Sequence, residues 1–187
     1  RDLEPLEEKG VLKRVHGGAM LQKNEANVPS FMVRYERNIA EKNAIGKLAA
    51  TLIQPESSVC FDAGTTTLAI VKNLPQALHF TAITTGIRTS LELSQFRDVD
   101  IIQVGGSLDH GTLTICNEIS AEFIKRFRAD VAFLSTRAID TAQGSYDNYL
   151  NLVGEKRALA SIAKKVVIVA DHTKFENTPL CLAVPLS

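Results

Sequence analysis

The chain has 187 residues, of which 45% are hydrophobic and 22% are charged. These values predict one ordinary globular domain, or one domain with a short appendage, and enough residues to bury a sizeable core. Lysine plus arginine equals aspartate plus glutamate at 21 each, which excludes a bulk nucleic-acid binder with a basic surplus.

The sequence shows no sign of a membrane span, a leader or a metal site. Its apolar stretches fall far short of the roughly 20 residues of a membrane helix, and no signal-peptide pattern opens the chain. The four histidines lack metal-ligand spacing. The three cysteines contain no CxxC pair and are expected to be buried, reduced thiols: Cys60, Cys116 and Cys181. We therefore expect a cytoplasmic protein without a metal or other cofactor.

Residues 1–30 differ in composition from the rest of the chain. They are polar and interrupted by glycine and proline, which predicts the end of a helix, a short hairpin and a linker. From residue 31 to 53, apolar positions recur at steps of three and four, which predicts one helix. Pro55 follows the end of that helix.

From residue 57 onward, predicted strands and helices alternate. The strands are expected at 58–61, 80–84, 100–104, 131–135 and 165–170, with a further candidate at 180–184. The helices are expected at 66–74, 86–95, 120–127 and 151–163, with Leu91 and Leu93 as apolar anchors of the second. Strands that are apolar on both faces predict an α/β fold, with a mostly parallel, Rossmann-like sheet flanked by helices.

The segment after the first predicted strand has the features of an anion cradle. It reads Asp62-Ala63-Gly64-Thr65-Thr66-Thr67. The glycine permits close backbone approach, the first turn of the next helix offers free N–H groups, and threonine hydroxyls add donors. The alternative is that Asp62 is a turn acid and Thr65 a simple N-cap. The segment is neither a Walker loop nor a dinucleotide fingerprint.

Polar residues follow five of the predicted strands. They are Asp62 to Thr65, Thr84 to Gly86, Gly105 with Gly106, Arg137 to Asp140, and Asp171 to Lys174. In open α/β sheets the ligand binds at the carboxyl ends of the strands. The sequence therefore predicts a site for a small phosphorylated molecule, which is bound rather than necessarily transformed.

Several cationic side chains are candidates for that site. Lys174 follows a strand and could pair with a phosphate as a point charge. Arg34 and Lys42 lie eight residues apart on the predicted helix 31–53 and would share one face of it. For these residues, and for Lys156 and Arg137, the alternative is an exposed side chain. His172 is interpreted as a loop histidine without a catalytic role.

Taken in order, several segments resemble the DeoR family of bacterial transcriptional repressors. They are Arg1 to Leu3, Gly10 to Ala19, Asp62 to Thr67, Gly105-Gly106, Ile139-Asp140 with Gly144, and Asp171 with Lys174-Phe175. The first two look like the end of the recognition helix and the wing of a winged helix-turn-helix. The resemblance covers nearly the whole chain.

The resemblance implies a domain organisation and a role. Residues 1–30 would be the remnant of the winged helix with a linker, and residues 31–187 an effector-sensing domain similar to ribose-5-phosphate isomerase and CoA-transferase domains. A phosphorylated sugar would bind there and alter the affinity of the full-length protein, a homodimer or homotetramer, for operator DNA. This fragment, which holds only the last residues of the winged helix, is not expected to bind an operator specifically.

The strand-end residues and the resemblance together give the candidate residues. The effector-binding set is Asp62, Gly64, Thr65, Thr66, Thr67, Thr84, Thr85, Gly105, Gly106, Arg137, Lys156 and Lys174. The remnant of the DNA-binding domain comprises Arg1, Arg14, His16, Gly17 and Gly18. No catalytic residue and no metal ligand is assigned.

The chain departs from the family pattern at four places, all of which bear on the identity of the effector. Thr85 stands where the family usually has an asparagine, Asn117 where a glycine is common, and Arg137 where a small residue is usual. The acid that usually lies about a turn before Lys156 is interpreted as replaced by Leu152 or Val153.

Two alternatives to a sensor remain. A sugar-phosphate isomerase needs a carboxylate base and an electrophile, but residues 138–144 hold one acid and the chain has no Lys-Gly-Gly-Gly run. A CoA transferase needs a nucleophilic glutamate, for which no strand end offers a clear candidate. The other alternative is an oligomerisation-only domain. The sequence favours a binding module over an enzyme.

Overall fold

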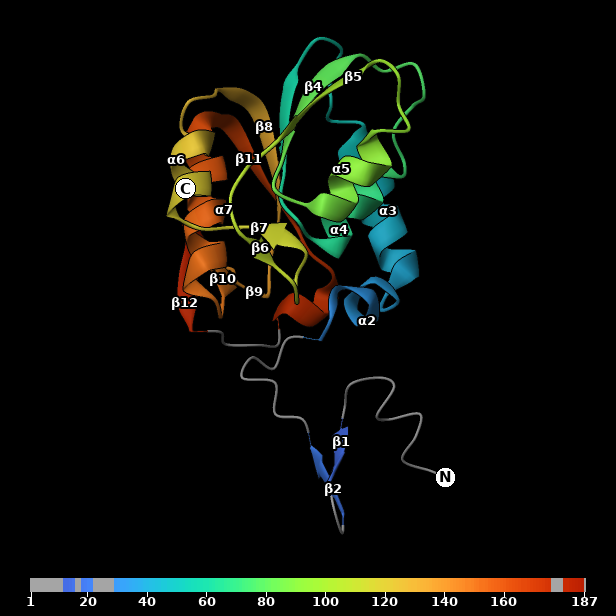
Figure 1. Ribbon diagram of the computed structural model, residues 1–187. Coiled ribbons are helices and arrows are strands. Elements are labelled where there is room, and N and C mark those ends of the chain that lie inside the picture. The colour runs from blue at the N-terminus through green and yellow to red at the C-terminus, as the bar shows by residue number, and fades with distance from the viewer. Residues whose placement is uncertain (1–11, 16–17, 22–28, 176–179, 187) are drawn as a thin grey trace.

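The computed structural model describes residues 12–15, 18–21, 29–175 and 180–186 (Figure 1). Strand β1 (Leu12–Val15) pairs antiparallel with β2 (Gly18–Leu21), which is the short hairpin expected from the sequence. Of the predicted DNA-binding remnant, Arg1, His16, Gly17 and the side chain of Arg14 lie outside the described residues, as do the predicted helix end and most of the linker. Gly18 is exposed.

A five-stranded parallel sheet forms the centre of the α/β domain. Its strands are β3 (Ser58–Phe61), β4 (Phe80–Thr84), β5 (Val99–Gln103), β8 (Ala129–Ser135) and β11 (Ala163–Val169). They lie in the order β11-β8-β3-β4-β5, and every neighbouring pair is parallel. The five strands predicted from alternating apolar segments are confirmed, with ends shifted by at most two residues, and so is the fold class.

Helices cover both faces of this sheet (Figure 1). One face carries α3 (Ile39–Ala50), α4 (Thr65–Val71) and α5 (Ile87–Leu93), and the other carries α6 (Glu118–Ile124) and α7 (Leu150–Ile162). Along β3, Phe61 packs into the first core and stacks on Phe133 at 5.8 Å between ring centroids, whereas Cys60 packs into the second core. This alternation explains why the strand is apolar throughout.

The predicted helix 31–53 is wrong as a single element. The structure has α2 (Phe31–Tyr35), then a turn, then α3. Asn38 adopts a left-handed conformation with φ of 51°, which asparagine tolerates better than most residues. The buried Lys42 Nζ donates to the carbonyl oxygens of Arg34 and Arg37. The break therefore brings the Lys42 side chain back to the end of α2. The sequence had instead predicted that Arg34 and Lys42 would share one face of a continuous helix.

Short antiparallel strands extend the domain beyond the parallel sheet. Strands β12 (Cys181–Pro185), β10 (Gly144–Asp147) and β9 (Ala138–Asp140) form a second sheet in that order. Strands β6 (Leu108–Asp109) and β7 (Thr114–Ile115) form a hairpin. Of these, the sequence indicated only β12. The others hold two to four residues, which is too short for a periodic apolar pattern.

Smaller expectations have mixed outcomes. Leu93 is buried as predicted, but Leu91 is 58% exposed and does not anchor α5. All three cysteines are free; Cys60 and Cys116 are buried, whereas Cys181 is half-buried. Within the described ranges, no helix is both long enough and apolar enough to cross a membrane.

Candidate functional site

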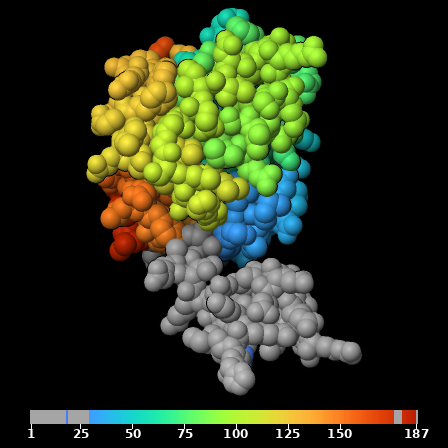
Figure 2. Space-filling view, in the orientation of Figure 1, coloured from blue at the N-terminus to red at the C-terminus, as the bar shows by residue number. Residues whose placement is uncertain are grey.

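A pocket of about 680 Å³ opens at the carboxyl ends of β3, β8 and β11. The 3-10 helix η1 (His172–Phe175), the start of α4 and the turn between α2 and α3 contribute to its wall. The β6–β7 hairpin lies against α2, as the yellow-green and blue surfaces in Figure 2 show. Between them, Phe31 N donates to Gly111 O at 3.1 Å. The charged lining residues are Arg34, Arg37, Lys42, Asp62, Arg137, Asp147, Glu155, Lys156, Asp171 and Lys174.

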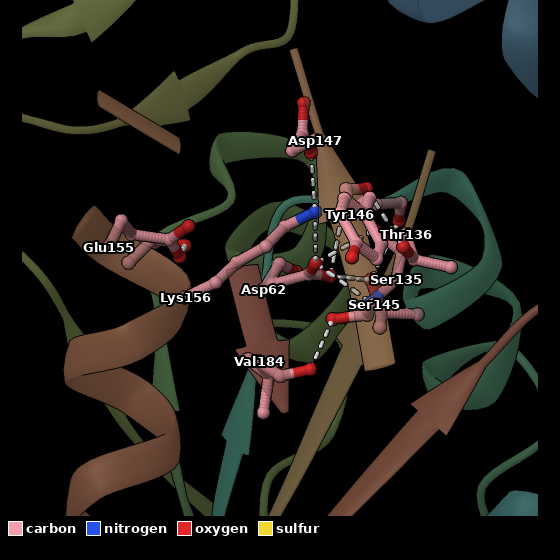
Figure 3. Close-up of polar contacts among 12 residues, drawn as sticks. Asp62, Ser135, Thr136, Ser145, Tyr146, Asp147, Glu155, Lys156 and Val184 are labelled. Atoms are coloured by element: carbon pink, nitrogen blue, oxygen red, sulfur yellow. Dashed lines mark hydrogen bonds and ion pairs between the residues drawn. The ribbon is translucent and has the colours of Figure 1, made fainter. Parts of the chain in front are cut away.

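Asp62 holds the loop after β3 in place. Its Oδ1 accepts from Gly64 N at 3.0 Å and from Thr67 Oγ1 at 2.8 Å. Its Oδ2 accepts from the amide and hydroxyl of Ser135 at 2.8 and 2.7 Å (Figure 3). Four donors hold this buried carboxylate, so its position suits loop support better than proton transfer.

Of the three threonines in the predicted anion cradle, two line the pocket. Thr65 and Thr66 line the pocket, and within the described chain no acceptor meets their backbone amides and no partner meets their hydroxyls. Thr67 does not line the pocket, because its hydroxyl donates to Asp62 and to Gly64 O. Gly64 is required by Ser135: an added Cβ would lie 2.2 Å from the Ser135 hydroxyl oxygen. The close approach is thus between two loops of the protein.

Besides Thr67, four of the predicted site residues lie outside the pocket lining. Thr84 and Thr85 are fully buried; Thr84 Oγ1 accepts from Gly86 N, and Thr85 Oγ1 donates to Glu155. Gly105 and Gly106 lie on an exposed turn. Gly106 has φ of 146°, and its added Cβ would lie 2.9 Å from Asn117 Oδ1, so backbone conformation accounts for this glycine.

Lys156 belongs to a buried ion-pair network. Its Nζ lies 2.8 Å from Asp147 Oδ2 and 3.9 Å from Asp62 Oδ2, between the two acids in Figure 3. Burial disfavours the ammonium, but Asp147 and Asp62 outweigh burial and raise the pKa of Lys156. The exposed-lysine alternative is therefore wrong, and the position of Lys156 is fixed from within the protein.

Sequence reasoning missed three residues of this network: Ser135, Asp147 and Glu155. Glu155 is fully buried beside Thr85, and burial followed by the nearby Asp62 raises its pKa to about 8. The interpretation that Leu152 or Val153 had replaced an acid near Lys156 overlooked these two carboxylates. Glu155 directly precedes Lys156, and adjacent helical residues do not normally share a face, so the pair gave no periodic signal.

Two arginines line the pocket without an ion pair to any carboxylate in the described ranges. Arg34 Nε donates to Pro29 O at 3.2 Å, and its guanidinium lies over the Phe31 ring at 5.6 Å. Buried Nη2 atoms of Arg34 and of Arg137 have no hydrogen-bond partner among the described residues, and no carboxylate there forms an ion pair with either. Burial, followed by the charge of Arg137, lowers the pKa of Arg34 to about 10.

The last strand end adds Lys174 and Asp171 to the same wall. Burial lowers the pKa of Lys174, and nearby Asp171 opposes that shift. Asp171 Oδ1 accepts from Thr173 N at 3.1 Å and also from its hydroxyl. His172 is exposed and does not line the pocket. In the part of the chain that the structure describes, no group of three or more His, Cys, Asp or Glu side chains could hold a metal ion.

The fold is similar to that of ribose 5-phosphate isomerase A. Ribose 5-phosphate isomerase A from Neisseria gonorrhoeae matches 72% of this chain with a TM-score of 0.53 and 15% sequence identity, which shows the fold alone. The chain spans about half of that enzyme, 52% of its length.

Sequence comparison supplies the family. Residues 37–187 match the model of the DeoR C terminal sensor domain, and residues 1–25 match the DeoR-like helix-turn-helix domain. The chain belongs to the DeoR family of transcriptional regulators.

Named relatives agree with this assignment. The HTH-type transcriptional regulator GolR of Listeria innocua is 38% identical over 92% of this chain and 68% of its own length. The uncharacterized regulator YgbI of Escherichia coli K12 is 35% identical over 100% of this chain and 73% of its own. The predicted resemblance is confirmed, and the chain is a transcriptional regulator with a sensor domain.

Proposed function

We propose that the pocket of the sensor domain binds a phosphorylated sugar, and that this binding changes the affinity of the repressor for its operator DNA. The observation that carries the proposal is the pair Thr65 and Thr66, whose free amides and hydroxyls open into the pocket at the start of α4. Backbone N–H groups at a helix start attract an anion through hydrogen bonding and the helix dipole.

The charge of the pocket supports an anionic ligand. Six cationic side chains line it against four acidic ones, an excess of two positive charges. The excess becomes three when Glu155 is neutral, as its raised pKa of about 8 favours at neutral pH. Asp147 and Ser135 also line the pocket, and their oxygen atoms can accept hydrogen bonds from sugar hydroxyls.

The same proposal assigns the domains and the route of regulation. Residues 1–30 belong to the winged helix and its linker, and residues 31–187 form the sensor. A ligand would fix the loops after β3, β8 and β11 and, through Arg34, the α2–α3 turn that follows the linker. A coupling of roughly 1–3 kcal/mol suffices to change operator occupancy several-fold. Paired operator half-sites are read by symmetric oligomers, so we propose a homodimer or homotetramer.

Substitution of Thr66 tests the phosphate site. Thr66→Asp places a carboxylate at the start of α4, where it suits the helix dipole but repels a phosphate. We expect Thr66→Asp to abolish the thermal shift that pentose, hexose or amino-sugar phosphates produce. Thr66→Asn, whose side chain has the shape of aspartate without its charge, should retain the shift. A ligand at 100 times its dissociation constant stabilises by about 2.7 kcal/mol, which raises the melting temperature by several degrees.

The unphosphorylated sugars serve as ligand controls and should produce no shift. Equal binding by the Asp and Asn variants would place the phosphate elsewhere. A folded wild-type chain that responds to no phosphorylated compound would instead support the oligomerisation-only alternative.

A further inference from the structure

We infer that the effector carries a second acidic group besides its phosphate, and that Arg34 and Arg137 bind this group together. The inference rests on the proposed function, because it takes the phosphate to lie at Thr65 and Thr66. It narrows the ligand from phosphorylated sugars in general to those with two anionic ends.

The first observation is the unused hydrogen-bonding capacity of the two guanidinium groups. Each has a buried Nη2 with no partner among the described residues, and each lines the pocket. Each arginine is half-buried, and a buried guanidinium nitrogen without a hydrogen-bond partner is costly in free energy. Because no carboxylate among the described residues forms an ion pair with either arginine, an anionic ligand can supply the missing partner.

The second observation is that the arginines share one region of the pocket. After burial, the charge of Arg137 is the next cause that lowers the pKa of Arg34, and both arginines lower the pKa of Lys174. Asp171 already accepts from Thr173, and the Arg34 carbonyl accepts from Lys42. The nearby Asp62, Asp147 and Asp109 oppose the shift of Arg34 without forming an ion pair with it among the described residues, so an anion bound beside both arginines would relieve their repulsion.

The third reason is that one phosphate cannot bind at the start of α4 and also supply acceptors to both arginines. A phosphate monoester carries a charge of about −1.5 to −2 at neutral pH. Bound at the amides of Thr65 and Thr66, it would leave about one of the pocket's three excess positive charges at neutral pH, and it would not supply planar acceptors to two separate guanidinium groups. Arginine forks match a carboxylate in geometry. A sugar acid phosphate, with its carboxylate at the end opposite the phosphate, therefore fits the pocket; a sugar bisphosphate shares the dianionic chemistry.

Calorimetric titration of the 187-residue chain with matched ligands tests the inference. The series pairs aldose phosphates of four to six carbons with the corresponding aldonate phosphates, for example erythrose 4-phosphate with 4-phosphoerythronate, and adds sugar bisphosphates. We expect at least one doubly acidic member to bind about tenfold or more tightly than its aldose phosphate, the gain expected for a charged hydrogen bond. Preference for an aldonate phosphate or for a bisphosphate identifies the second group as carboxylate or phosphate. Aldose phosphates that bind equally well or better overturn the inference but leave the proposed function standing.

Variants of Arg137 then separate the two anion sites. Arg137→Gln should weaken the doubly acidic ligand about tenfold or more beyond any loss for the aldose phosphate, which loses only the general attraction of one positive charge. Arg97→Gln, an exposed arginine on no pocket wall, is the matched control and should leave both affinities unchanged. An equal loss for both ligands in Arg137→Gln would show that Arg137 holds the phosphate itself, which overturns the inference. Binding of no phosphorylated ligand to the folded wild type would instead reject the proposed function.

Discussion

Gly64 shows at the scale of one residue how the structure adds a reason for a glycine that the sequence did not reveal. The sequence suggested that this glycine lets the backbone approach a ligand. In the structure its φ of −76° suits any residue, and the atom that comes close is the side chain of Ser135. Ser135 donates to Asp62, so the glycine permits the contact that fixes the loop after β3 to the end of β8.

Gly64→Ala should therefore destabilise the domain. The new Cβ would lie 2.2 Å from Ser135 Oγ and 3.0 Å from Asp62 Oδ1, so Ser135 must move and its hydrogen bonds to Asp62 are lost. We expect the free energy of unfolding to fall by about 2–3 kcal/mol in urea denaturation.

Gly154→Ala is the control for that substitution. Gly154 is exposed on α7, and its added Cβ would meet no atom within 4 Å. Alanine should stabilise the helix by up to about 1 kcal/mol. Similar effects of the two substitutions would contradict the assigned role of Gly64.

The α2–α3 junction shows at the scale of elements what periodicity cannot detect. Apolar spacing is nearly continuous from residue 31 to 53, yet the helix breaks at Asn38. The break is stabilised by Lys42, which bonds two carbonyl groups at the end of α2. Since those carbonyls belong to Arg34 and Arg37, Lys42 also positions two cations of the pocket.

Lys42→Met should keep the buried aliphatic stem but remove both hydrogen bonds. We expect the free energy of unfolding to fall by about 1–3 kcal/mol and the affinity for a phosphorylated ligand to fall as well, because Arg34 loses its support. Denaturation and calorimetry measure the two effects. Lys47→Met, on an exposed position of α3, should change neither; a loss of the same size in both variants would remove the special role of Lys42.

At the scale of the whole molecule, the buried carboxylates make folding depend on pH. Glu155 has a pKa raised from 4.5 to about 8, so the folded state binds its proton more tightly than the unfolded state. The stability linked to Glu155 is complete below pH 4.5 and is lost as the pH rises towards 8. His79, whose pKa is raised by Glu56, contributes with the same sign.

Comparison with Glu155→Gln isolates this carboxyl group. The free energy of unfolding of the wild type should fall by roughly 2–4 kcal/mol more than that of the variant between pH 5 and pH 8. Glu118→Gln, at an exposed position, should follow the wild type. Parallel pH profiles of wild type and Glu155→Gln would show that Glu155 is ionised in the folded protein throughout this range.

The predictable parts of this protein are those with a local signal. Each central strand is a run of apolar residues bounded by turns, and both faces of the sheet are covered, so the runs are continuous and easy to recognise. The polar residues that follow β3, β8 and β11 could be assigned to one edge because parallel strands end on the same side. The sequence also predicted site residues after β4 and β5, namely Thr84, Thr85, Gly105 and Gly106. These residues do not line the pocket, and the local sequence does not indicate which strand ends do.

The sequence by itself determined the parallel α/β fold, the family and the edge of the sheet where the pocket lies, because these follow from periodicity and from ordered local motifs. Only the tertiary structure decided which side chains are used within the fold and which face the pocket. Asp62, Asp147 and Lys156 satisfy one another, whereas Arg34 and Arg137 form no ion pair with a carboxylate among the described residues. The physical reason is that partners in a buried charge network come from segments far apart in the chain, and their distances are set by how sheet and helices pack.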